Sequence, residues 1–370
     1  MTIRPGTHEE GFLQDIVDHP DDPTTRLIYA DWLEERDDPR SELIRLQHVE
    51  RKKTDVECVR EQVLGFREET RWKAYFASRN IPLANIWFRG GLPYKISMTA
   101  PDFLEHASTV FHTAPIQAVH LSNVDHQLLS FVCCNSVTER LRELDLHGCN
   151  LGNWGAYTLA HGPHLANLRT LNVASTGMNS DSIRHLTTSP ILTAIEHVNL
   201  SGMPLGNYYA MSAIVASPWK LNTLNLSLAN LTQYALELLG ESNKLDGIEE
   251  LDISRNYHAA AGVPDLLRQE RTNRLRSLNL AGNPIRPQGA FFIAGCESLR
   301  QLERLDLQRC DIGLFGARRI FGTLNLPSLR YLNLSNNLGV PTIGPDAEDF
   351  HLQAEKRGIK LKLNLQLGES

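Results

Sequence analysis

A repeated six-residue pattern constrains this chain more than any other feature. Leucine or another aliphatic residue recurs at its first, fourth and sixth positions, and from Leu141 onward the pattern occurs eight times, at intervals of 26 or 27 residues. The copies begin at Leu141, Leu168, Ile195, Leu221, Ile248, Leu275, Leu302 and Leu329, and a weaker copy begins upstream at Ile116. Chance apolar spacing does not hold one register through seven intervals, so each copy is predicted to be one structural unit of a repeat array.

Each copy is predicted to hold a strand, a turn and a helix. Its fourth and sixth positions point to one side and its third, fifth and seventh to the other, which is the period of a strand with one buried face. Another apolar residue usually follows at the eleventh position, then a small residue and an apolar helical stretch such as ARRIFGTL. Units this short bury their apolar faces only against neighbouring copies, so we expect an α/β solenoid.

This pattern resembles the leucine-rich repeat family, and its length is similar to that of the ribonuclease-inhibitor-like variant. The family pattern has Asn or a small polar residue at the ninth position, from which Met203 and Ala229 depart. The resemblance implies a right-handed solenoid (horseshoe) with a concave parallel sheet and convex helices. We predict that the repeat domain covers residues 86–370, with an N-terminal cap repeat at 86–115, repeats at 116–340 and a C-terminal cap at 341–370 whose last strand closes the sheet.

The region before the repeats is predicted to be a small all-α bundle. Capping and proline signals at Thr7, Asp22–Pro23, Asp38–Pro39 and Thr54 predict four helix starts. Arg26–Arg36 reads RLIYADWLEER, and DPR and ELIRLQ follow. This stretch resembles the bacterial repeat-companion domain, which stands ahead of repeat arrays.

The resemblance implies association with repeats and no established activity. We predict a helical companion domain at residues 1–52 and a connector helix and linker at 53–85. Within the motif, Asp31 beside Trp32 is either a functional acid or, as we favour, the partner of an arginine or a helix end.

Composition excludes several classes of protein. The chain has 37 Lys and Arg against 43 Asp and Glu, a net charge of −6, which argues against binding along a nucleic-acid backbone. No apolar run reaches the roughly 18 residues of a membrane span, and the amino terminus has no signal-peptide core. The six cysteines have neither a CxxC pair nor zinc-finger spacing. We therefore expect a cytoplasmic protein with six free thiols, with a redox role of Cys133 and Cys134 as the alternative.

No motif for catalysis stands out. The sequence has no nucleophile elbow, Walker loop, HExxH or dinucleotide fingerprint, so we predict no enzyme and no cofactor. His120 and Asp145 occupy the fifth position of adjacent copies, with His147 and Glu143 beside them; they form either a metal site or, as we favour, an ordinary solvated surface. His258 replaces an apolar residue at the eleventh position and is predicted to be partly buried.

The outward positions of the strands are the remaining candidates for a site. The fifth position is always Asp or Asn, a column predicted to hydrogen bond along the sheet. Charged and aromatic side chains gather in the carboxyl-terminal half, where we expect an acidic partner to dock. The predicted partner-binding residues are Arg304, Tyr331, Arg309, Arg255, Glu250, Asp252, Asp306, Glu143, Asp145 and His147.

The predicted function is a non-catalytic scaffold that binds a protein or peptide, with neither nucleic acid nor membrane as partner. The alternative is a GTPase-activating or other catalytic accessory protein of the ribonuclease-inhibitor-like type, in which an exposed Arg or Asn acts on a partner GTPase. This alternative rests on fold-level analogy alone.

Overall fold

A computed structural model describes residues 8–19, 22–268, 270–323 and 325–363. The chain divides into two compact units, one of residues 1–146 and 162–168 and the other of residues 147–161 and 169–370. The domain boundaries predicted after residues 52 and 85 remain predictions.

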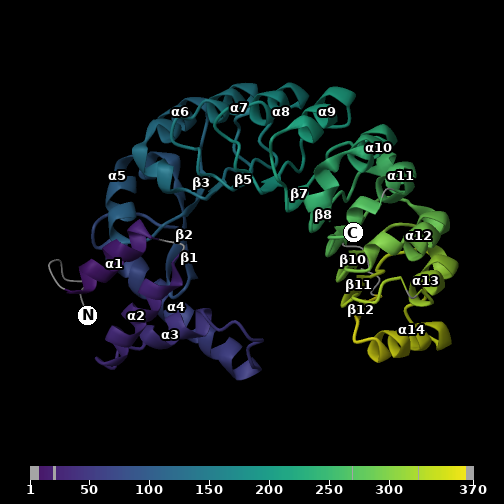
Figure 1. Cartoon of the computed structure of the whole chain (residues 1–370), viewed down its shortest axis with the longest axis horizontal. Helices are drawn as coiled ribbons and strands as arrows, with labels where there is room; N and C mark the ends of the chain where they lie inside the picture. Colours follow the sequence, from purple (N-terminus) through teal and green to yellow (C-terminus); the bar gives the residue numbers. More distant parts are fainter. Residues whose placement is uncertain (1–7, 20–21, 269, 324, 364–370) are drawn as a thin grey trace, which may run out of the picture. The chain divides into compact units, whose positions relative to one another are not determined.

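Four helices begin the first unit, and they start where the capping signals lie. They are α1 His8–Asp18, α2 Pro23–Glu34, α3 Arg40–Gln47 and α4 Asp55–Ala77 (Figure 1). The Asp22 carboxylate caps α2 by accepting from the Thr24 N–H, and Thr54 forms a capping box with Glu57 at the start of α4. Helix α3 begins directly after Asp38–Pro39, where the Arg40 N–H donates to the Asp38 carboxylate, so three of the four predicted starts are confirmed. The cap predicted at Thr7 lies outside the described residues.

A buried ionic network crosses the core of this helical region. The Arg40 guanidinium donates to Asp38 at 2.7 Å, to Glu9 at 2.5 Å and to the Tyr29 hydroxyl at 2.8 Å. The side chains of Arg40, Glu9 and Asp38 are only 6%, 12% and 9% exposed. Burial opposes ionisation of Asp38, but hydrogen bonds from the Arg40 side chain and backbone outweigh it and hold the pKa of Asp38 below its usual range. Tyr29 joins the network to a buried apolar cluster of α1, α2 and α3 that includes Leu33.

An antiparallel hairpin follows, in place of the single strand expected from residue 87. Its strands are β1 Asn85–Arg89 and β2 Leu92–Thr99, joined at Gly90 and Gly91, which both have positive φ. The Gly91 N–H donates to the Gln47 side chain at 2.7 Å, and a Cβ at Gly91 would collide with Ile44 of α3. The turn therefore requires glycine because helix α3 packs directly against it.

The rest of the first unit takes the repeat pattern. Helix α5 Ala100–Thr113 leads to β3 Ala118–Ser122, and α6 His126–Cys134 with a short 3₁₀ helix leads to β4 Glu143–Asp145. Strands β2, β3 and β4 pair in parallel and in chain order.

The second unit repeats strand and helix in the predicted register. Its strands are β5 Thr170–Asn172, β6 His197–Asn199, β7 Thr223–Asn225, β8 Glu250–Asp252, β9 Ser277–Asn279, β10 Arg304–Asp306, β11 Tyr331–Asn333 and β12 Lys360–Lys362. Its α-helices are α7 Gly152–Ala160, α8 Ser180–Thr187, α9 Tyr208–Ala216, α10 Gln233–Glu241, α11 Val263–Arg268, α12 Arg286–Gly295, α13 Gly313–Phe321 and α14 Pro345–Lys356. Neighbouring strands are parallel, so that Leu278, Leu305 and Leu332 stand side by side.

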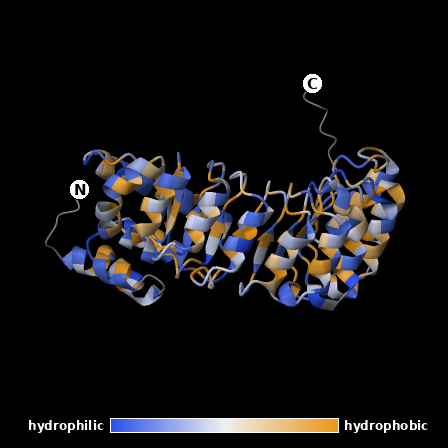
Figure 2. Cartoon of the chain, turned by 90° about the horizontal axis from the view of Figure 1, so that it is seen from above, coloured by the Kyte–Doolittle hydropathy of each residue, from blue (hydrophilic) through white to orange (hydrophobic). Residues whose placement is uncertain are grey.

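Strands and helices of the second unit lie on opposite sides of its core. The strands line one side of the unit and the helices the other (Figure 1). The helices carry hydrophobic and hydrophilic residues together (Figure 2), as expected of helices with one buried face. Leucines at the fourth and sixth positions, such as Leu305 and Leu307, are fully buried. The predicted α/β leucine-rich-repeat type of solenoid with a parallel sheet is confirmed.

Ninth-position asparagines hold the turns of the second unit together. The buried Asn256 side chain accepts from the backbone N–H groups of Ala229 and Leu231, both at 3.0 Å, and donates to three backbone carbonyls. Asn283 in turn accepts from the Asn256 N–H at 2.7 Å. Ala229 departs from the family pattern, but its backbone N–H still has a partner in the asparagine of the next copy. Ala229 itself is buried.

The end of the described chain holds a helix and a strand within the range predicted as the C-terminal cap. Gly358 has φ of +65° just after α14, and β12 pairs in parallel with β11. Lys360 and Lys362 point outward from this last strand, which discourages edge-to-edge association. The residues predicted to continue the strand beyond Leu363 lie outside the described part.

Candidate functional site

In the second unit, the Asp and Asn side chains at the fifth position of each copy hydrogen bond to the backbone just after them. In each copy from β5 to β11, a side-chain oxygen of the Asp or Asn accepts from the backbone N–H two residues later. The second Asp252 oxygen accepts from Asn279 at 2.8 Å, and that of Asp306 accepts from Asn333 at 3.0 Å. The predicted hydrogen bonding along the sheet occurs in these two pairs, and the other bonds of the column stay within one chain segment.

Arg304 and Tyr331 form a stacked pair on the strand side of the second unit. They are partners in the register of β10 and β11, as their shared third position predicted. The guanidinium carbon of Arg304 lies 4.0 Å from the Tyr331 ring centroid, within cation–π range. The ammonium of Lys362 lies 5.7 Å from the same ring. The ring thus gathers cationic side chains from the strands on both sides of it.

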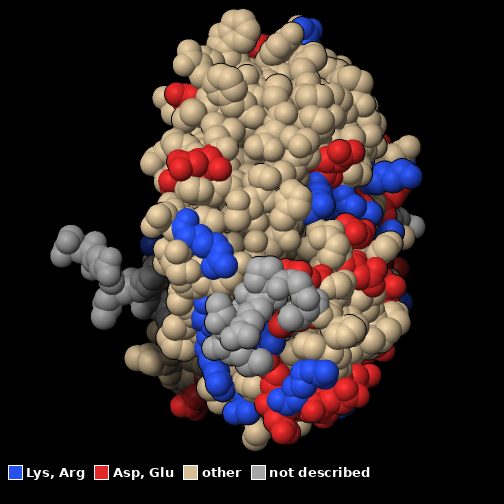
Figure 3. Space-filling model, turned by 90° about the vertical axis from the view of Figure 1, so that its left-hand side faces the viewer, with Lys and Arg blue, Asp and Glu red and all other residues tan. Residues whose placement is uncertain are grey.

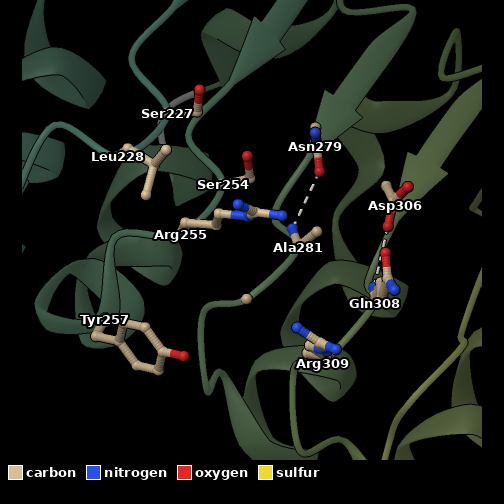
Figure 4. Close-up of a pocket in the computed structure, with 11 residues that line it drawn as sticks. Ser227, Leu228, Ser254, Arg255, Tyr257, Asn279, Ala281, Asp306, Gln308 and Arg309 are labelled. Atoms are coloured by element: carbon tan, nitrogen blue, oxygen red, sulfur yellow. Dashed lines mark hydrogen bonds between the residues drawn. The ribbon is translucent and has the colours of Figure 1, made fainter. Parts of the chain in front are cut away.

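A polar hollow opens where strands β8, β9 and β10 end. It has a volume of about 630 Å³, and among the residues lining it are Arg255, Tyr257, Gly282, Gln308 and Arg309. Arg255 and Tyr257 project into it from one repeat and Arg309 from the repeat two further on (Figure 4). The sequence indicated both arginines as partner-binding residues but did not indicate Tyr257 or the hollow itself. The sequence feature that could have indicated the hollow is Gly282, which stands at the same position of the repeat between the two arginines and has no side chain to fill the space.

The acids of this surface do not neutralise its arginines. Asp252 and Asp306 are engaged by amides as described, and Glu250 is exposed on β8. Among the described residues, no ion pair forms with Arg255, Arg304 or Arg309. We define the strand face as the outward residues of β8–β12 together with the hollow; in the part of the chain described, it holds cations without acidic partners.

The predicted residues at the start of the repeats do not belong to this face. Glu143 and Asp145 lie in the first unit, where Lys95 forms an ion pair with Glu143 and lies 3.6 Å from Asp145. His120, next to Asp145 in the register, shares a hydrogen bond of 2.8 Å with Ser97. His147 belongs to the second unit. The metal alternative therefore stays a prediction, and Lys95 would compete with a metal for the same carboxylates.

The structure also shows the contacts and exposure of the other residues considered in the sequence, namely Asp31, the cysteines and His258. Asp31 pairs with Arg45 at 2.5 Å, as favoured above. No disulfide joins any of the six cysteines, which all lie in the described part of the chain. Burial raises the pKa of Cys133 to about 12, which removes the thiolate that a redox switch needs. The expectation for His258 is wrong: it is exposed, because the segment after β8 turns into a 3₁₀ helix at Tyr257.

The surface of the first unit shows no large patch of one charge in the view of Figure 3. Basic and acidic side chains lie mixed on the lower part of that face, and the upper part has few of either.

Within the described residues, no helix is long and apolar enough to cross a membrane.

Fold and surface together define a repeat solenoid that exposes the outer face of a parallel sheet. Residues 141–160 and 274–294 match the family described as Leucine Rich repeat. This chain is a leucine-rich repeat protein. The ribonuclease-inhibitor-like subtype and the N-terminal companion domain remain predictions.

Solved structures with similar folds share little sequence with the chain. An internalin from Listeria monocytogenes is 14% identical with a TM-score of 0.40, over 74% of this chain and 80% of the other. A TLR13–ssRNA13 complex is 18% identical with a TM-score of 0.33, over 71% of this chain and 42% of the other. Rad7 in its yeast complex with Elc1 is 15% identical with a TM-score of 0.31, over 58% of this chain and 67% of the other. None of the curated proteins compared with the sequence matches it.

Proposed function

We propose that this chain is a non-catalytic interaction protein whose strand face binds an acidic segment of another protein. The observation that carries the proposal is the absence of acidic partners for Arg255, Arg304 and Arg309 in the part of the chain described. An exposed arginine without a carboxylate partner keeps its hydrogen-bond donors available to a ligand.

The residue types of the face support the same conclusion. Arg and Tyr are enriched among the residues that dominate binding energy, because they combine a large contact area with directed hydrogen bonds. Stacking on Tyr331 restricts the motion of Arg304 before any partner arrives, so less side-chain entropy is lost on binding. The rigid sheet beneath holds both side chains in fixed register.

The test begins with a crosslinked pull-down from the native cell, using the full chain, to identify a binding partner. The affinity of that partner is then measured for Arg304→Ala and Tyr331→Ala. Each should weaken binding by about 1 to 3 kcal/mol without lowering the melting temperature. Arg319→Ala is a matched control, because Arg319 also lies over an aromatic ring, Phe291, but belongs to helix α13.

Two results would contradict this proposal. If neither Arg304→Ala nor Tyr331→Ala loses threefold in affinity while substitution of Thr170 or Asn199 does, the partner contacts another part of the sheet. If Arg319→Ala weakens binding as much as Arg304→Ala, general charge rather than the strand face explains the interaction.

A further inference from the structure

We infer that the hollow between Arg255 and Arg309 binds a phosphorylated side chain of the partner. This inference rests on the proposed function and specifies the chemistry of one contact within it. It concerns the end of β8, β9 and β10, where two guanidinium groups from different repeats face one space (Figure 4).

The two arginines occupy a backbone position that does not favour them. Position eight is left-handed in every copy of the repeat, with φ of +57° at Arg255 and +54° at Arg309. Gly148, Gly202, Gly282 and Asn336 fill four of the other copies with residues that adopt this conformation easily, and Ser175 and Leu228 fill the remaining two. An arginine here gives up backbone stability, and strained residues of this kind tend to lie at functional sites.

The repeat between them leaves the space open. Gly282 occupies position eight of that copy, and a Cβ built on it would lie 3.2 Å from the Cγ of Arg255. Its neighbour Ala281 is also small, so no long side chain of β9 fills the gap. Because adjacent strands are about 4.8 Å apart, the two arginines are separated by roughly 10 Å along the sheet, which leaves room for one tetrahedral anion between them.

Arg255 and Arg309 bring two positive charges to the hollow, and Asp306 brings one negative charge. Seven other arginines of the second unit form ion pairs: Arg169, Arg268, Arg271, Arg274, Arg276, Arg300 and Arg318. Arg255 and Arg309 have no such pair among the described residues. Asp306 also lines the hollow, but one of its oxygens accepts from the Gln308 N–H and the other from Asn333.

A phosphomonoester matches this arrangement better than a carboxylate does. It carries a charge of about −1.5 to −2 at pH 7, and its oxygens suit the planar fork of a guanidinium. A single carboxylate would leave one of the two arginines unpaired. The Tyr257 side chain, which also reaches the hollow, offers a further hydroxyl donor.

The experiment titrates the full chain with the peptide acetyl-Ala-phosphoserine-Ala-amide by calorimetry. The same peptide with Glu in place of phosphoserine, inorganic phosphate and dimethyl phosphate serve as comparison ligands. We expect the phosphopeptide to bind at least fivefold more tightly than the Glu peptide and dimethyl phosphate, and no more weakly than inorganic phosphate. Its affinity should fall below about pH 6, where the phosphate takes up its second proton.

Variants locate the binding. Arg255→Asn and Arg309→Asn keep a residue suited to the left-handed backbone and should each weaken phosphopeptide binding at least tenfold. Arg286→Asn is the matched control, because Arg286 is also exposed with φ of +63° but does not line the hollow, and it should change affinity less than twofold. Gly282→Asn keeps both arginines and fills the gap, so it should also weaken binding.

Several results would overturn the inference. Equal binding to wild type and to the Arg255→Asn, Arg309→Asn double variant would show that the anion lies elsewhere. Tighter binding of inorganic phosphate than of the phosphopeptide would assign the hollow to free phosphate, and equal binding of dimethyl phosphate would point to nucleic acid. If the phosphopeptide fails to bind while partner binding still depends on Arg304, this inference fails and the proposed function stands.

Discussion

The N-terminal helices and the repeats of the second unit bury polar groups in different ways. Helices α1 to α3 share one buried ionic network centred on Arg40, which holds Glu9, Asp38 and Tyr29. The repeats instead use the same uncharged contacts many times, with leucines at two positions and asparagines at a third. A single network concentrates stability in one residue, whereas an array spreads it over many equivalent ones.

The largest effect is expected at Arg40. Arg40→Met keeps most of the side-chain length but leaves the carboxylates of Glu9 and Asp38 buried without a cation. Breaking a buried pair in this way costs about 3 to 5 kcal/mol of unfolding free energy. Hydrogen exchange of the peptides in α1 to α3 during urea unfolding measures the effect. Arg271→Met, which breaks a largely exposed pair with Asp246, should cost less than about 1 kcal/mol.

A smaller or similar loss is expected from one leucine of the array. Leu278 and Leu305 are fully buried partners in the register of β9 and β10. Changing either to Ala leaves a cavity and should cost roughly 2 to 5 kcal/mol. The loss should be largest in the altered repeat and its neighbours, as followed by hydrogen exchange of β8 to β11. A change below about 0.5 kcal/mol at both sites would mean that the assigned register is wrong.

The smallest and most selective effect is expected from acid. The pKa of Asp38 is lowered in the folded state, so its contribution to stability is complete above the ordinary Asp pKa of about 3.9 and is lost as pH falls through the lower folded value. The buried leucine and asparagine side chains that hold the repeats together do not take up protons in this pH range. Protection of α1 to α3 from exchange should therefore fall below about pH 4 more steeply than protection of β9 to β11.

Asp38→Asn provides the control for the acid experiment. It removes the titrating group, so the protein should be less stable at pH 7 and the acid dependence of α1 to α3 should flatten. If the two regions lose protection in parallel in wild type and variant alike, the ionic network does not distinguish them.

Periodicity made the repeat region readable from the sequence. A strand with one buried face must alternate, and a stacked copy must repeat its register, so Leu278 and Leu305 could be assigned to the core without a structure. Helix caps were equally readable, because Asp22 and Thr54 bond to N–H groups two or three residues away. The hairpin at Gly90 and Gly91 also had a local signal, a glycine pair between two apolar runs. The prediction of a single strand in this repeat did not use that signal.

Periodicity assigned the leucines of the strands to the core, located the start of each repeat and placed Arg255 and Arg309 among the candidate binding residues. Which charges remain available for binding depends on contacts that only the folded chain makes. Lys95 pairs with Glu143, whereas Asp252 and Asp306 bond to the asparagines of the next strands and leave the nearby arginines without acids among the described residues. The physical reason is that a periodic pattern fixes the direction of a side chain, but a partner some 27 residues away is chosen by the distance between neighbouring strands.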